Sequence, residues 1–194
     1  MESLKLHITP GEVYRRSDLE YFSSAVDRHL SLLLQDGTLL KLSHGLYYAP
    51  KKSKFGLVPP NDLNMVERFL KDNTFLLVSP NSYNTLGLGL TQLYNTTWVY
   101  NHKRHGEFTL NDKKFLFKLK SSFPKTITIE FLVIDLLNNL DELAEDATQI
   151  VKNFQINADR FNANELVMLS KYYGSGFTKK LVRLAIRNIK LSYA

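Results

Sequence analysis

The sequence predicts an α+β fold, with an N-terminal winged helix-turn-helix followed by a mixed α+β domain that ends in helices. Two helix-start signatures and a glycine-centred hairpin stand within residues 1–50. Short β-prone runs follow up to Leu119, and beyond Pro124 apolar residues recur at three- and four-residue spacing. A polar, basic segment before Val58-Pro59-Pro60 indicates a boundary, giving domains 1–56 and 57–194.

The first domain follows from its helix signals. Ser17 and Glu20 have capping-box spacing, so we expect a helix to begin at Ser17. A second helix is expected from Ser24 to about Asp36, with an apolar stripe and with Gly37 as its left-handed cap. The runs 38–42 and 46–49 then predict a hairpin, which completes a helix-turn-helix with its wing. Only a short helix fits before Pro10.

The sequence of the second domain predicts strands followed by helices. Asn61 can cap a helix. We expect strands at residues 74–78, 97–100, 107–110 and 114–119, the last two joined by a turn at Asn111-Asp112. Helices are expected at 127–140, 141–154, 163–173 and 178–193.

Composition and charge favour a polyanionic partner. No apolar run reaches the roughly 20 residues that cross a bilayer, so we expect a cytoplasmic protein without a membrane partner. The chain lacks cysteine, and its formal net charge is +6. Neutralising nucleic-acid phosphates releases counterions, which favours binding by basic proteins. The acids between Asp135 and Asp146 are interpreted as a solvated helix face and turn, and bases dominate from Lys171 onwards.

Polar side chains of the second helix could read DNA bases. If its apolar stripe faces the core, Arg28 lies on the opposite side, where it could bind guanine bidentately. The hairpin side carries bases and no carboxylate from Thr38 through Pro60. Taken singly, each residue also fits an ordinary solvated surface. The predicted DNA-binding residues are Arg15, Arg16, Ser17, Ser24, Arg28, Ser31, Gln35, Lys41, His44, Tyr47, Lys51 and Lys52.

Two further basic groups could contact a partner. The loop after Tyr100 could recognise a protein or nucleic acid, or could be a solvated turn. The last helix carries a basic stripe that could hold an acidic protein surface, extend a DNA footprint, or be solvated. The predicted partner-binding residues are Lys103, Arg104, His105, Lys179, Lys180, Arg183 and Arg187.

The sequence carries no catalytic signature. No Gly-x-Ser-x-Gly motif is present, and Gly87-Leu88-Gly89 lacks the rest of a phosphate-binding loop. His102 and His105 have no third ligand in register, and the acids of the predicted strands are isolated. We therefore predict no enzyme activity, no catalytic residues, no cofactor and no metal. A nucleic-acid-processing enzyme remains the weaker alternative.

Four runs of the chain resemble the abortive-infection (AbiEi-like) antitoxin family of type IV toxin-antitoxin systems. They are GEVYRRSDL at 11–19, VDRHL at 26–30, KLSHGLYY at 41–48 and SPNSYNTLG at 79–87. The resemblance implies a winged-helix repressor domain that binds double-stranded DNA at its own operator. It also implies a C-terminal domain that counters a nucleotidyltransferase-type toxin, by contacting the toxin or its RNA substrate. The alternative is a protein-interaction module that does not read DNA.

Overall fold

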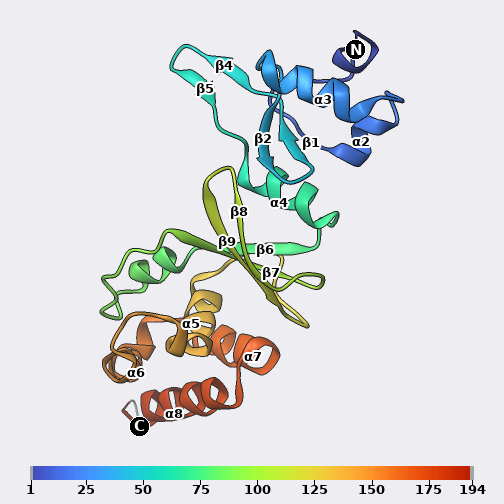
Figure 1. The fold of residues 1–194 in the computed structure, drawn as a ribbon. Coiled ribbons are helices and arrows are strands. Elements are labelled where there is room, and N and C mark those ends of the chain that lie inside the picture. The colour runs from blue at the N-terminus through green and yellow to red at the C-terminus, as the bar shows by residue number, and fades with distance from the viewer. Residues whose placement is uncertain (1, 193–194) are drawn as a thin grey trace. The chain divides into compact units, whose positions relative to one another are not determined.

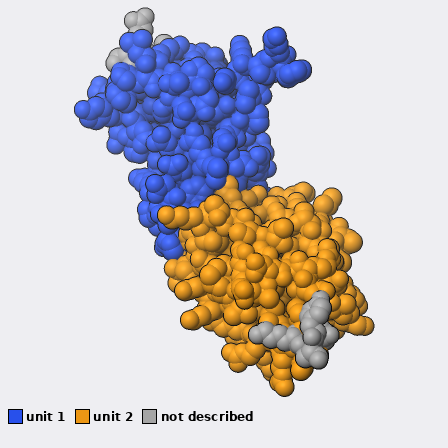
Figure 2. All heavy atoms as spheres, turned by 180° about the vertical axis from the view of Figure 1, so that it is seen from behind, with its two compact units in different colours: residues 1–75, 101–117 blue, residues 76–100, 118–194 orange. Residues whose placement is uncertain are grey.

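The computed structural model describes residues 2–192 and has a mixed α+β fold with three small sheets and C-terminal helices (Figure 1). The predicted α+β class is thus confirmed. The strand orders are β1-β3-β2, β4-β5 and β6-β7-β9-β8. The chain divides into two compact units, one formed by residues 1–75 and 101–117, the other by 76–100 and 118–194 (Figure 2).

The first unit opens with three helices and a three-stranded antiparallel sheet. In β1-β3-β2, Val13 lies opposite Tyr48, and Tyr47 lies opposite Lys41. The elements are α1 (Glu2–Lys5), β1 (Val13–Arg15), α2 (Arg16–Glu20), α3 (Val26–Gln35), β2 (Leu40–Ser43) and β3 (Leu46–Tyr48).

The apolar stripe of α3 packs into the core of this unit. Its side chains Val26, Leu30 and Leu33 are buried, and Leu34 packs against the same cluster. Leu4 of α1 and Leu19 of α2 complete the cluster from the other helices. Burying a leucine side chain stabilises a fold by about 1.5–3 kcal/mol. The predicted inward face of the second helix is therefore confirmed.

The starts of α2 and α3 differ from the prediction. α2 begins at Arg16 rather than Ser17, because Asp18 Oδ2 accepts a hydrogen bond from the Arg15 backbone N–H at 3.0 Å. α3 begins at Val26, two residues after Ser24.

The end of α3 agrees with the prediction. α3 ends at Gln35, and Gly37 has a positive φ of 74°. That left-handed conformation favours glycine after a helix, so the predicted glycine cap is confirmed.

A second hairpin occupies the polar, basic segment in which we placed the domain boundary. It joins β4 (Lys51–Ser53) to β5 (Gly56–Val58), with Ser53 opposite Gly56. Ser53 Oγ accepts a hydrogen bond from the Phe55 N–H at 3.2 Å and donates one to the Gly56 carbonyl at 3.0 Å. The first unit continues beyond this hairpin, and the division into domains 1–56 and 57–194 stays a prediction.

α4 (Asp62–Leu70) and a third hairpin complete the first unit. Asn61 caps α4 as predicted, because its Oδ1 accepts from the N–H groups of Leu63 and Asn64. The hairpin joins β8 (Gly106–Leu110) to β9 (Lys113–Leu119), of which residues 113–117 belong to this unit. Asn111 and Asp112 both have positive φ, which confirms the predicted turn.

The second unit has a helical C-terminal part, in which α5 packs against α7 and α8. Residues 131–137 of α5 are all buried, as expected for a helix covered on every side. Its elements are β6 (Phe75–Val78), a 3₁₀ helix (Pro80–Leu86), β7 (Thr96–Asn101), α5 (Ile129–Asn138), two short 3₁₀ turns (Leu140–Glu142 and Ala158–Arg160), α6 (Ala147–Ile156), α7 (Ala163–Tyr173) and α8 (Gly176–Ser192).

Two expectations about the acidic segment are wrong. The helix predicted from Asp141 begins only at Ala147, because Asp146 Oδ1 accepts from the Gln149 N–H and caps α6 there. Asp135, expected on a solvated face, is only 2% exposed. It accepts hydrogen bonds from the hydroxyls of Tyr83 and Tyr100 at 2.6 and 2.7 Å.

Within residues 2–192, no helix is both long and apolar enough to cross a membrane.

Candidate nucleic-acid interface

α3 presents an exposed polar face opposite its buried stripe. Asp27, Arg28, Ser31 and Gln35 of the helix are exposed, as is Ser24, which lies just before it. In the described part of the chain, no carboxylate forms an ion pair with Arg28, although Arg16 pairs with its neighbour Asp27. The Arg28 guanidinium, with its fork of N–H donors, is therefore available to an incoming acceptor.

Arg16 pairs with the one carboxylate on this face of α3. Its Nε and Nη2 donate to Asp27 Oδ1 and Oδ2, each at 2.7 Å, and Nη1 contacts Glu20. The hydrogen bonds with Asp27 raise the pKa of Arg16 and lower the pKa of Asp27. This pairing joins α2 to α3 and neutralises Asp27 beside Arg28. A phosphate contact by Arg16 stays a prediction.

Arg15 is not part of the α3 face. Its Nη1 donates to the carbonyl of Arg68 in α4 at 3.0 Å. Burial lowers the pKa of Arg15, an effect that the Asp18 carboxylate opposes and the positive charge of Arg104 reinforces. Arg15 therefore faces a different part of the first unit from Arg28, while Ser17 is exposed on α2.

The hairpin residues have differing exposure. Lys41 on β2 and His44 in the turn are exposed, and Lys51 and Lys52 are exposed on β4. Tyr47 instead packs against the core cluster, and burial raises the pKa of its hydroxyl. The lysine side chains are exposed to solvent, whereas Tyr47 contributes mainly to packing, and a phosphate contact by the lysines stays a prediction.

Two side chains of the predicted basic loop contact residues of the same unit. Lys103 Nζ contacts Asp72 Oδ2 at 3.0 Å and the Lys71 carbonyl at 2.9 Å. The Arg104 guanidinium lies 4.6 Å from the centre of the Phe69 ring. His105 is exposed. Lys103, Arg104 and His105 belong to the first unit, whereas the predicted partner-binding residues of α8 belong to the second. The two groups are therefore separate candidate binding sites.

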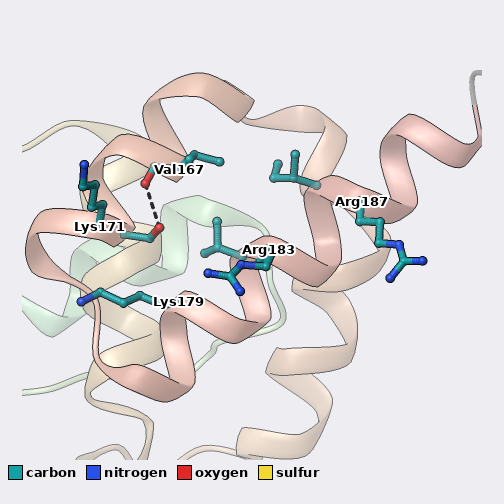
Figure 3. Close-up of a pocket in the computed structure, with 8 residues that line it drawn as sticks. Val167, Lys171, Lys179, Arg183 and Arg187 are labelled. Carbon is teal, nitrogen blue, oxygen red and sulfur yellow. Dashed lines mark hydrogen bonds between the residues drawn. The ribbon is translucent and has the colours of Figure 1, made fainter.

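The basic stripe of α8 borders a groove in the second unit. The groove has a volume of about 580 Å³, and Figure 3 shows basic side chains from both α7 and α8 around it. Lys180 is exposed but does not line it. Its apolar lining is Val167, Val182 and Ile186, and its cations are Lys171, Lys179, Arg183 and Arg187.

This lining suits an acidic segment that also carries apolar residues. Among residues 2–192, no carboxylate pairs with the four cations of the groove, although other lysines and arginines do form ion pairs. Lys171 and Val167 were not among the binding residues predicted from the sequence. Their positions four residues apart in a predicted helix placed them on one face, but nothing indicated that α8 would lie beside it.

Comparison with protein-family models, curated proteins and solved structures found no match to this chain. Within the described residues, no group of three or more His, Asp or Glu side chains could hold a metal ion.

Proposed function

We propose that the protein is a DNA-binding transcriptional regulator and antitoxin, and that its first unit contains a winged helix-turn-helix. The order α1-β1-α2-α3-β2-β3 supports this proposal, because a helix pair is followed directly by a hairpin. α2 and α3 pack together, and only residues 21–25 separate them. The observation that carries the proposal is the exposed face of α3, with Arg28 free of ion pairs among residues 2–192.

In this proposal α3 enters the major groove and Arg28 binds a guanine through O6 and N7. The Arg16 guanidinium lowers the cost of bringing Asp27 near phosphates, because the two charges cancel locally. Lys41, Lys51 and Lys52 contact the backbone and contribute affinity without sequence preference.

The antitoxin part of the proposal rests on the family resemblance and on the groove between α7 and α8. An acidic, partly apolar segment of a toxin would bind along Val182 and Ile186, with its carboxylates at Arg183 and Arg187. The alternative is a protein-interaction module that does not read DNA. In that case the groove still binds a partner, and Arg28 has no role in base recognition.

A binding assay with DNA from upstream of the gene tests the regulator proposal. We expect Arg28→Ala to lower specific affinity by about 10- to 100-fold, from the loss of one bidentate base contact. Arg28→Lys is the matched control for charge, and it should also lose specificity, because an ammonium cannot form the fork. Lys51→Ala should weaken binding to all sequences alike. Unchanged specific affinity in both Arg28 variants would refute the proposal.

Binding to the product of the neighbouring reading frame tests the antitoxin proposal. Arg183→Glu should abolish complex formation by reversing one charge of the groove, and Lys180→Glu, outside the groove, should leave it intact. Equal binding by both variants would contradict a role for the groove.

A further inference from the structure

A second cavity lies entirely within the first unit, between the β2–β3 turn, α4 and the β8–β9 hairpin. Its volume is about 460 Å³, within the range of small-molecule sites. Its lining includes Arg15 and His44, the aromatic rings of Phe69 and Phe108, and Arg104. None of the functions proposed above requires this cavity.

Two arginines bring positive charge to this cavity. Burial lowers the pKa of Arg15, and the positive charge of Arg104 acts in the same direction. Arg104 lies 4.6 Å from the centre of the Phe69 ring and 5.8 Å from that of Phe108. These cation–π contacts fix the guanidinium without neutralising it.

The nearby carboxylates are already engaged elsewhere. Asp18 accepts from the backbone N–H of Arg15 and lies 3.9 Å from Arg68. Glu107 lies 3.7 Å from Lys114. Among the residues that the structure describes, no carboxylate pairs with Arg104, whereas Lys103 next to it pairs with Asp72. An anion between Arg15 and Arg104 would relieve the repulsion of two like charges.

The cavity also offers hydroxyl groups and apolar contacts. Ser43 and Thr109, which carry hydroxyl groups, are among its lining residues. Leu46 and Leu110 add buried apolar surface to the lining.

We propose that this cavity binds a small organic anion, with its oxyanion group between Arg15 and Arg104 and its apolar part against Leu46 and Phe108. Arginine forks bind both carboxylates and phosphates through paired N–H donors. The proposal concerns the first unit alone and does not depend on DNA binding.

Calorimetric titration of the full chain at low salt tests the proposal. The probes are phenyl phosphate, phenylacetate, inorganic phosphate and neutral benzyl alcohol. We expect saturable binding of at least one aromatic anion, weaker binding of inorganic phosphate and none of benzyl alcohol. The stronger aromatic anion identifies the oxyanion. No saturable binding of either aromatic anion up to about 10 mM would overturn the proposal.

Variants locate the site. Arg104→Gln should weaken binding of the aromatic anion at least about tenfold, because a charged fork is replaced by a neutral amide. The Arg104 side chain is exposed, so this variant should fold, and Arg15→Gln gives an independent second test. Arg160→Gln, at an exposed position of the second unit that lines neither this cavity nor the α8 groove, is the matched control and should bind normally. Loss of binding in the control, with Arg104→Gln unaffected, would overturn the proposal.

Discussion

The buried carboxylate of Asp135 should be important for the stability of the second unit. Its oxygens accept hydrogen bonds from the hydroxyls of Tyr83 and Tyr100, and Asn139 Nδ2 donates to Oδ1 at 3.2 Å. Asp135→Ala removes the acceptor of both tyrosine hydroxyls. Asp141→Ala is the matched control, because it removes the same charge from an exposed position.

The expected loss can be worked from these contacts. A buried polar group left without a partner costs about 1–3 kcal/mol. The two tyrosine hydroxyls together give a loss of about 2–6 kcal/mol, to which the cavity left by the carboxylate adds. Asp141→Ala should change the free energy of unfolding by less than about 0.5 kcal/mol, since such surface changes are usually small.

The loss should depend on pH. Burial raises the pKa of Asp135, and the hydrogen bonds from the two tyrosines oppose that rise. A raised folded-state pKa gives a contribution to stability that is present below the unfolded value of about 3.9. This contribution is lost as the pH rises through the folded-state pKa of Asp135. The difference between wild type and Asp135→Ala should therefore be larger near pH 4 than near pH 8.

Urea unfolding followed by circular dichroism measures this difference at each pH. A loss below about 1 kcal/mol at every pH would refute the reasoning, because it would leave no cost for two buried hydroxyls that have lost their acceptor. A loss that grows as pH rises would contradict the direction assigned to the pKa.

Two further predictions concern the first unit. Leu33→Ala should lower the free energy of unfolding by about 2–5 kcal/mol, because Leu33 is fully buried. Leu32→Ala should lower the free energy of unfolding much less, because Leu32 is 38% exposed. Equal losses for the two variants in urea unfolding would contradict the packing of α3. Lys5 and Thr38 lower the pKa of Asp36 to about 2, so Lys5→Ala should raise that pKa toward its ordinary value. An NMR titration of the Asp36 carboxyl measures it, and an unchanged value would exclude the 2.7 Å ion pair in solution.

The local signals of the first unit could be read from the sequence. The spacing of Val26, Leu30 and Leu33 placed the inward face of α3, and Gly37 and Gly45 placed its end and the hairpin turn. The start of α2 was wrong by one residue, because Asp18, rather than Glu20, is the acid of the capping box and accepts a hydrogen bond from the Arg15 N–H.

Contacts between distant segments could not be predicted in this way. Asp135 has the sequence neighbourhood of an acid on a surface helix, and its partners Tyr83 and Tyr100 are 52 and 35 positions away. Arg15, at the end of β1, and Arg104, in the loop before β8, likewise line one cavity although they are far apart in the sequence. Periodicity describes one element at a time and carries no information on which elements become neighbours.

Protection of guanine N7 from methylation tests most directly whether α3 reads the major groove. Dimethyl sulfate methylates this atom, which Arg28 would cover on bound DNA. We predict that wild-type protein protects at least one guanine in its upstream DNA and that Arg28→Ala, at saturating concentration, leaves that guanine reactive. Identical protection patterns for the two proteins, or no protected guanine at saturation, would contradict the account.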